Sequence, residues 1–179
     1  MNLIETYNFT RNSSDKEVYH KYITNFYSEK FSKFKNENIN ILEIGVLYGD
    51  SLKLWDDFFI NARIYGADIQ NIIRHNYSDK VSLIFENAYS EEFLEKMKTN
   101  NLYFDIIIED GPHTLDTQFF FLSRFGEILK KQQGSMLILE DVYPTEFEVL
   151  KKSFPEFSVL DFRKEIGGEY NSVIFYKES

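Results

Sequence analysis

The strongest constraint on the fold is a series of short apolar runs that alternate with helix-like segments. The runs lie at residues 39–45, 62–69, 81–85, 103–110 and 135–141. Stretches within them, such as DIII and MLIL, are apolar at every position, which is typical of a parallel strand with helices on both faces. The segments between the runs favour helices at 50–60, 90–100 and 114–131. This alternation predicts an α/β fold with a Rossmann-like, doubly wound, mostly parallel sheet.

Both ends of the chain depart from this alternation. In the first 38 positions, apolar residues recur with the spacing of one helix face at Val18, Tyr22, Ile23, Phe26 and Phe31. Ser14 or Asp15 is the expected cap of this helix. At the other end, FSVLDFRKE and NSVIFYKE flank IGGEY, whose paired glycines favour a turn. We expect one domain over 1–179, with a helical cap at 1–38 and a core at 39–179 that finishes with an antiparallel hairpin at the sheet edge.

The composition excludes several classes of function. Lysine and arginine number 20 against 29 aspartates and glutamates, a net charge of -9 that would repel a nucleic-acid backbone. The sequence contains no cysteine, which rules out disulfides, thiolate metal sites and a cysteine nucleophile. It shows neither a signal-peptide pattern nor an apolar stretch of membrane-spanning length. We expect a soluble, cytoplasmic protein that binds neither nucleic acid nor membrane.

The segment LEIGVLYGDSLKLW runs from a strand into a helix through Gly45 and Gly49. Glycines at such a turn let the backbone approach a ligand that a Cβ atom would block. A tight turn without a ligand explains the two glycines equally well. The segment lacks the full dinucleotide-binding fingerprint and is not a phosphate-binding loop.

Two further strand ends bear on the same question. Asp68 closes the second apolar run, where a carboxylate can accept both ribose hydroxyl hydrogens, although it could also cap a surface helix. After the third run, Asn87 and Ala88 lie at the expected adenine edge, and Asn87 could instead cap a helix near Ser90. An acidic chain with this arrangement favours an adenosine ligand without phosphate, so S-adenosylmethionine fits better than a dinucleotide.

The most informative stretch is FDIIIEDGPHTLD, which delivers Asp110 and His113 to the end of an apolar strand. A second strand, MLILEDVY, delivers Glu140 and Asp141 to the same edge of the sheet. Singly, these acids could be a helix cap and solvated loop residues. Together they repel one another unless a cation joins them, and an oxygen ligand set favours Mg²⁺, or Mn²⁺, over zinc.

Metal and imidazole together suit the methylation of a hydroxyl. A bound metal lowers the pKa of a coordinated hydroxyl, and a nearby imidazole accepts its proton near neutral pH. We favour His113 as this base because His20 and His75 lie in polar segments without a comparable carboxylate setting. A surface position is expected for His20.

These motifs resemble those of the macrocin and mycinamicin sugar O-methyltransferases, a metal-dependent branch of the class I methyltransferases. The resemblance runs from SDKEVYHKY through LEIGVLYGDSLKLWDDFF and NARIYGADI to FDIIIEDGPH and MLILEDV. Its specific part is the pairing of D-G-x-H with a later E-D.

The resemblance implies the class I methyltransferase fold and a role for each matching residue. It implies Asp110, Glu140 and Asp141 as Mg²⁺ ligands and His113 as general base. It places the donor S-adenosylmethionine against Lys16, Glu43, Gly45, Gly49, Ser51, Asp68, Asn87, Ala88 and Asp110. Within that set, Glu43 and Gly45 would line the methionine part and Asp68 the ribose, while Asp15 and Lys16 belong to a segment that closes over the donor.

Two departures limit what carries over. The family's G-D after the third strand is replaced by Asn87-Ala88, and the chain lacks the large N-terminal domain and the long insertions of the antibiotic enzymes. We therefore expect a sugar, a glycoside or a related small molecule as the hydroxyl acceptor, not the macrolide itself.

Other functions stay open at this stage. One is a methyltransferase of another acceptor class, such as a catechol-like phenol, a protein or a nucleic acid; EDGPH differs from the Pro-Pro-aromatic motif of amino-methylating enzymes. Another is a non-catalytic protein that binds S-adenosylmethionine. Aromatic residues of the N-terminal region would serve either a homo-oligomer contact or a substrate lid. The sequence identifies neither the acceptor, the methylated position nor the oligomeric state.

Overall fold

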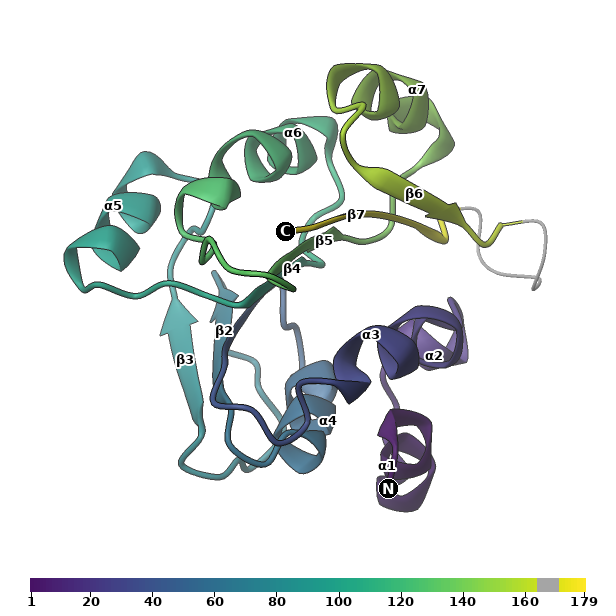
Figure 1. The fold of residues 1–179 in the computed structure, drawn as a ribbon, viewed down its shortest axis with the longest axis vertical. Helices are drawn as coiled ribbons and strands as arrows, with labels where there is room; N and C mark the ends of the chain where they lie inside the picture. Colours follow the sequence, from purple (N-terminus) through teal and green to yellow (C-terminus); the bar gives the residue numbers. More distant parts are fainter. Residues whose placement is uncertain (164–170) are drawn as a thin grey trace.

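The computed structural model describes residues 1–163 and 171–179, and its centre is a seven-stranded sheet in the order β3-β2-β1-β4-β5-β7-β6 (Figure 1). The strands are β1 (Asn40–Ile44), β2 (Arg63–Asp68), β3 (Val81–Phe85), β4 (Ile106–Glu109), β5 (Met136–Leu139), β6 (Ser158–Asp161) and β7 (Val173–Glu178). Strands β1 to β5 are parallel, and β7 is antiparallel to both β5 and β6. The predicted doubly wound sheet is confirmed, and its order reverses between β1 and β4, where such sheets bind ligands.

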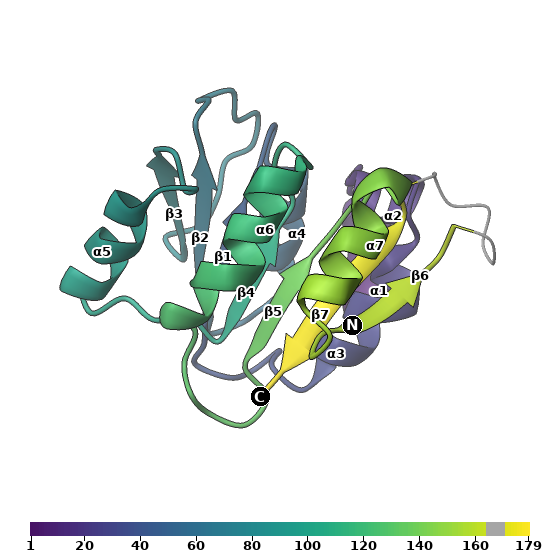
Figure 2. The ribbon, with the colours of Figure 1, turned by 90° about the horizontal axis from the view of Figure 1, so that it is seen from above.

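Helices cover both faces of the sheet (Figure 2). One face carries α4 (Asp50–Phe58) and the N-terminal helices; the other carries α5 (Glu91–Thr99), α6 (Leu115–Arg124) and α7 (Pro144–Ser153). In β4, Ile106 and Ile108 join the core on the α4 side, whereas Ile107 joins the core on the α6 side. The strand is apolar at every position because successive side chains enter two different cores.

The N-terminal segment differs from the single helix that its spacing predicts. It forms α1 (Leu3–Thr10), α2 (Asp15–Val18), a π-helical turn (Ile23–Tyr27) and α3 (Ser28–Ser32). Lys21 adopts a φ of 60°, which ends the first helical stretch and turns the next one. Val18 consequently lies on the surface at 48% exposure, against expectation, whereas Tyr22, Ile23, Phe26 and Phe31 are buried as predicted.

Two helices and the C-terminal hairpin also differ from what the sequence predicts. Helix α6 ends at Arg124 and continues as a short 3₁₀ turn (Phe125–Glu127), not to residue 131, because Phe125 and Ile128 enter the core and Leu129 pairs with Phe104. Helix α7, which begins with Pro144, was not anticipated.

In the C-terminal hairpin, only β6 lies at the sheet edge, since β7 inserts between β5 and β6. Its expected turn at IGGEY, residues 166–170, lies outside the described residues. Across 1–163 and 171–179, no helix combines the length and apolarity that crossing a bilayer requires.

Candidate active site

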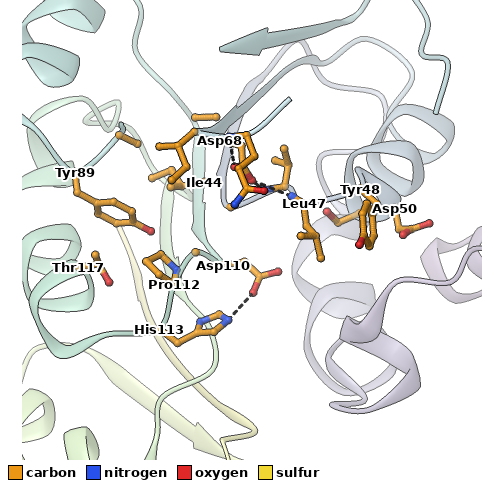
Figure 3. A pocket seen from close by; sticks show the side chains of 18 of the residues that line it. Ile44, Leu47, Tyr48, Asp50, Asp68, Tyr89, Asp110, Pro112, His113 and Thr117 are labelled. Carbon is orange, nitrogen blue, oxygen red and sulfur yellow. Dashed lines mark hydrogen bonds and ion pairs between the residues drawn. The ribbon is translucent and has the colours of Figure 1, made fainter. Parts of the chain in front are cut away.

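A cleft of about 830 Å³ opens at the carboxyl ends of β1 to β4 (Figure 3). Its walls come from the loops after these four strands and from residues 13–15 of the N-terminal segment. Of the residues singled out in the sequence, those that line the cleft are Gly45, Ser51, Asp68, Asn87, Ala88, Asp110 and His113. The remaining ones, Lys16, Glu43, Gly49, Glu140 and Asp141, lie outside its lining.

Both glycines of the β1–α4 loop are required by the backbone itself. Gly45 has a φ of 80°, and a Cβ atom there would lie 2.1 Å from the carbonyl oxygen of Asp110. Gly49 has a φ of 87° and begins α4, where a Cβ atom would come within 1.8 Å of the Tyr77 hydroxyl. Close packing of the loop against β4 therefore accounts for Gly45, and it brings the end of β1 next to Asp110.

Asp68 fastens this loop to the end of β2. One carboxylate oxygen accepts hydrogen bonds from the backbone N–H groups of Val46 and Leu47, both at 3.0 Å, and the other accepts from Gln70 N at 2.8 Å (Figure 3). Among the described residues, the second oxygen accepts only this one hydrogen bond, so it keeps a further lone pair, and Asp68 lines the cleft. The ribose contact stays a prediction.

The polar residues after β3 each make a different hydrogen bond. Asn87 Oδ1 accepts from Tyr89 N at 3.0 Å, while α5 is capped by Ser90, whose Oγ accepts from Phe93 N at 3.1 Å. The Tyr89 ring lines the cleft, and its hydroxyl donates to the buried Glu109. Burial raises the pKa of Glu109 to about 8. This Tyr89–Glu109 pair could not be predicted from the sequence, because Glu109 is simply the last residue of a strand there.

Asp110, His113 and Asp141 gather at one end of the cleft. Their nearest ligand atoms all lie within 4.8 Å of one another. His113 Nε2 is 3.8 Å from Asp110 Oδ1 and 3.8 Å from Asp141 Oδ2, and Figure 3 shows the first of these contacts. Three of the four groups predicted for the chemical site therefore meet at a point where a cation could bind all three.

Glu140, the fourth group, faces the N-terminal segment. One of its oxygens accepts a hydrogen bond from the Tyr27 hydroxyl, and the other lies 2.5 Å from Lys16 Nζ. The side chain is 1% exposed. In the described structure Glu140 is a neighbour of the cluster that Asp110, His113 and Asp141 form, and its predicted role as a metal ligand stays a prediction.

Lys16 is buried beneath the cleft among carboxylates. Its Nζ lies 2.6 Å from Asp110, 2.5 Å from Glu140 and 3.2 Å from Glu43. Glu43 also accepts a hydrogen bond from Trp55 Nε1 at 2.7 Å. Burial alone would lower the pKa of Lys16, but the three carboxylates raise it well above its ordinary value.

Asp141 is held from its other side by the N-terminal segment. Its Oδ1 accepts from the Tyr22 hydroxyl at 2.7 Å and lies 3.5 Å from His20 Nδ1, which also contacts Ser172 Oγ at 2.8 Å. The surface position expected for His20 was wrong: the residue is 6% exposed. The break at Lys21 explains the error, because it turns His20 and Tyr22 inward together.

The acids of the cluster ionise less readily than free acids. Burial raises the pKa of Asp110 to about 6 and, together with the charge of Asp110, that of Asp141 to about 8; it also raises the pKa of Glu140. Burial and the charge of Lys16 lower the pKa of His113 to about 4, so its imidazole is neutral at pH 7. Raised carboxyl pKa values next to a neutral imidazole describe a site that favours an added cation.

Two residues of the cluster also have strained backbone conformations. His113 has a φ of 54° and Asp141 a φ of 56°, both in the left-handed region that non-glycine residues rarely occupy. Such conformations cost about 1 kcal/mol or more each and cluster at functional sites. The turns after β4 and β5 thus aim these two side chains at each other.

No family model matches the chain. Among curated proteins, it is 28% identical over 130 residues to mycinamicin VI 2''-O-methyltransferase of Micromonospora griseorubida, which covers 68% of this chain and 32% of that protein. Demethylmacrocin O-methyltransferase of Streptomyces fradiae is 26% identical over 130 residues, with the same coverage of 68% and 32%. The rhamnosyl tetracenomycin-C 2'-O-methyltransferase of Streptomyces olivaceus is 24% identical over 165 residues, 88% of this chain and 41% of that protein.

Among solved structures, MycE methyltransferase in complex with Mg, SAH and mycinamycin VI superposes with a TM-score of 0.76 at 21% identity, over 100% of this chain and 54% of that one. The fold is that of the class I methyltransferases. The chain also has a fold similar to that in a fibrillarin/Nop5p complex, with a TM-score of 0.57 at 14% identity, over 78% of this chain and 71% of that one. The expected resemblance to the macrocin and mycinamicin enzymes is confirmed, although the chain spans only about a third of the length of the first curated relatives.

Several residues around this class I methyltransferase cleft escaped the sequence analysis. The most important are the cluster's hydrogen-bonding neighbours, namely Tyr22, Tyr27, Trp55, Tyr89, Glu109 and Ser172. Tyr22, Tyr27 and Ser172 make their hydrogen bonds across 119, 113 and 152 positions of the chain. The apolar helical spacing marked Tyr22 only as a core residue, and it carried no information about the hydroxyl.

Proposed function

We propose that this protein is an S-adenosylmethionine-dependent O-methyltransferase that uses Mg²⁺ and methylates a hydroxyl of a sugar or related small molecule. The observation that carries the proposal is the meeting of Asp110, His113 and Asp141 at one end of a cleft, next to the β1–α4 loop. The curated relatives named as sugar O-methyltransferases support the reaction class. The MycE complexes with Mg and SAH support the cofactors.

The cleft suits a cationic nucleoside donor. Asp68 offers carboxylate oxygens at the predicted ribose position, and Asn87 and Ala88 lie at the predicted adenine edge. Asp15, Asp50 and Asp110 add negative charge along the same walls, which favours a sulfonium over a phosphate. Gly45 and Ser51 would then lie beside the methionine part, with the buried Glu43 behind them.

The residues at the end of the cleft fit a hard divalent cation. Asp110 and Asp141 supply carboxylate oxygens, the kind of ligand that Mg²⁺ prefers. The positive charge around these two carboxylates is too small to balance them. Asp110 and Asp141 would hold the ion, with Glu140 as a further ligand if its contacts with Lys16 and Tyr27 loosen. A bound Mg²⁺ supplies Lewis-acid stabilisation of the acceptor oxygen.

His113 would remove the proton. Its neutral imidazole can accept the hydroxyl proton at Nε2, the atom that faces Asp110 and Asp141. The acceptor oxygen then forms a bond to the donor methyl carbon while the carbon–sulfur bond breaks, and its electron pair leaves with sulfur as S-adenosylhomocysteine. The remaining contribution of the cleft is alignment of oxygen, carbon and sulfur.

The acceptor follows from the relatives and from charge. MycE is described with the glycoside mycinamycin VI, and several curated relatives are named for methylating sugar hydroxyls. The net charge of -9 disfavours a nucleic acid. Because the chain spans about a third of those relatives, we propose a small sugar or glycoside as the acceptor and not their antibiotics.

Two measurements test the proposal. Calorimetric titration with S-adenosylmethionine, in Mg²⁺ and in EDTA, should show donor binding in both. Transfer of a labelled methyl group to a panel of glycosides and catechols should require Mg²⁺ and favour the glycosides. Absence of donor binding would leave a non-enzymatic protein of this fold, and transfer to catechols alone would replace the sugar by a phenol.

A further inference from the structure

Lys16 is the least explained residue of the site. Its side chain is 1% exposed, and it is not among the residues that line the cleft. It reaches from α2 to three neighbouring strands, contacting Glu43 on β1, Asp110 after β4 and Glu140 after β5. A lysine placed this way is surrounded by acids on the side of the sheet where ligands bind.

The ammonium group of Lys16 is held mainly by two of these acids. Its Nζ donates hydrogen bonds to Asp110 at 2.6 Å and to Glu140 at 2.5 Å, and Glu43 Oε1 lies 3.2 Å away within ion-pair distance. Among the described residues, ion pairs link these carboxylates to no other lysine or arginine. Lys16 is therefore a compact cation fixed at the centre of the acids.

The two carboxylate oxygens of Asp110 face different groups. Oδ2 binds Lys16, whereas Oδ1 faces His113 on the side where Asp141 also lies. A carboxylate shared between two adjacent cation positions is the arrangement of two-metal sites, in which ions lie about 3.5–4 Å apart. Here one of the two positions is filled by the protein's own ammonium group.

We propose that Lys16 is a built-in cation that takes the place of a second metal ion, so that this acid cluster binds one divalent ion and not two. The metal part of this inference rests on the proposed function. Lys16 neutralises part of the charge of Glu43, Asp110 and Glu140 and fixes Asp110 with its free oxygen toward Asp141. It is a positioning residue, since it acts on the reaction through these carboxylates.

The test compares Lys16→Ala with Lys21→Ala, a control on the same segment whose lysine is 44% exposed and lies 3.6 Å from Glu17. Calorimetry and electron paramagnetic resonance with Mn²⁺ count the ions bound per chain. We expect one ion in the wild type and in the control, and two in Lys16→Ala. Butylammonium, which can fill the vacated space, should return the variant to one ion.

Thermal unfolding provides a readout that needs no divalent metal. Removing one partner of a buried ion pair in a chain of this size should lower the melting temperature of Lys16→Ala in EDTA by roughly 6–20 °C. Butylammonium should recover most of that loss, and the Lys21→Ala control should not respond to it. If Lys16→Ala does not fold, Lys16→Met combined with Glu140→Gln, which removes one charge of each sign, should fold and bind one ion.

Each outcome has one meaning. One ion in Lys16→Ala, or a melting temperature equal to that of the control, overturns the proposal, and so does an unfolded double variant. Absence of any Mn²⁺ binding to the wild type overturns the metal part of the proposed function. In that case, recovery of Lys16→Ala by butylammonium would still show the lysine acting as a cation, so the two failures are distinguishable.

Discussion

Two sets of buried acids in this protein have opposite surroundings. Asp56 of α4 accepts hydrogen bonds from Ser78 N at 2.9 Å and Ser78 Oγ at 2.5 Å, and its Oδ1 lies 3.3 Å from Lys80 Nζ. Burial would raise the pKa of Asp56, but these partners lower it overall. At the carboxyl ends of β4 and β5, Asp110 and Glu140 share Lys16, Asp141 lies beside them, and the pKa values of all three are raised.

The contrast separates a structural acid from the acids of the proposed cation site. Asp56 has its charge met by local donors, so the fold gains from keeping it ionised. The acids of the cluster are less stable as anions in the fold than in water, and only an added cation reverses this. Burial is common to both sets, so burial alone does not identify a functional carboxylate; the balance of charge around it does.

The largest expected effect is on the reaction itself. Replacing His113 by Ala removes the proposed base and should slow methyl transfer by about 10²–10⁴-fold while donor affinity changes little. Initial rates with labelled donor and calorimetry measure the two quantities. His75→Ala is the control for the loss of an imidazole, since His75 Nε2 contacts Asp50 at 2.9 Å and His75 itself is not among the residues that line the cleft. An unchanged rate in His113→Ala would remove the base from the mechanism.

Replacing an acid of the cluster should lower the metal affinity without lowering the stability of the metal-free protein. Asp141→Asn keeps an oxygen to accept from Tyr22 but loses one charge, so Mg²⁺ affinity should fall by at least about 10-fold. In EDTA, the free energy of unfolding should stay equal to that of the wild type or rise by about 1 kcal/mol, because the fold no longer contains this buried acid, which is hard to ionise. Urea denaturation with and without Mg²⁺ measures both effects. A clear loss of stability in EDTA would make Asp141 a structural acid.

Replacing Asp56 should change the free energy of unfolding in the opposite direction. Asp56→Asn weakens the bonds from Ser78 and the ion pair with Lys80, and should lower the free energy of unfolding by about 1–3 kcal/mol. Mg²⁺ binding should not change. The comparison fails if Asp56→Asn and Asp141→Asn shift the metal-free stability in the same direction.

The Asp56 effect should also depend on pH. Its folded-state pKa is lowered below the ordinary value of 3.8, so its stabilisation is complete above that pH and is lost as the pH falls through the folded-state pKa. The stability difference between wild type and Asp56→Asn should stay constant from about pH 7 to 5 and shrink below about pH 4. A difference that grows on acidification contradicts this sign.

The smallest effect belongs to the adjacent surface pair. Lys53 and Asp57 form an i,i+4 ion pair along α4 within reach of solvent. Asp57→Asn should change the free energy of unfolding by less than about 0.5 kcal/mol. Measured beside Asp56→Asn in the same urea series, it shows how much of the Asp56 effect comes from burial of the carboxylate.

The sequence predicted the sheet and its ligand edge well, because both depend on local patterns. Each of the five apolar runs contains a strand, and the polar groups after β4 and β5 lie where parallel strand ends must bring them. Gly45 and Asp68 also lie at the cleft, since the turn after β1 and the end of β2 are adjacent in any such sheet.

The parts that were missed depend on contacts between distant segments. Lys16 reaches Asp110 across 94 positions and Glu140 across 124 positions of the chain. The spacing of apolar residues does not predict which polar side chain will turn inward to make such a contact. The same applies to His20, whose burial depends on the left-handed conformation of Lys21, and to the direction in which Glu140 points.

The insertion of β7 between β5 and β6 has a consequence for synthesis on the ribosome. Until Val173–Glu178 has left the exit tunnel, one edge of β5 has no pairing strand, and Ser172 cannot yet meet His20. An exposed apolar edge such as MLIL is a site for unwanted association of nascent chains. The turn that presents Asp141 therefore matures only after β7 has emerged, and a ribosome stalled before β7 would carry the sheet without the strand that pairs with this edge of β5.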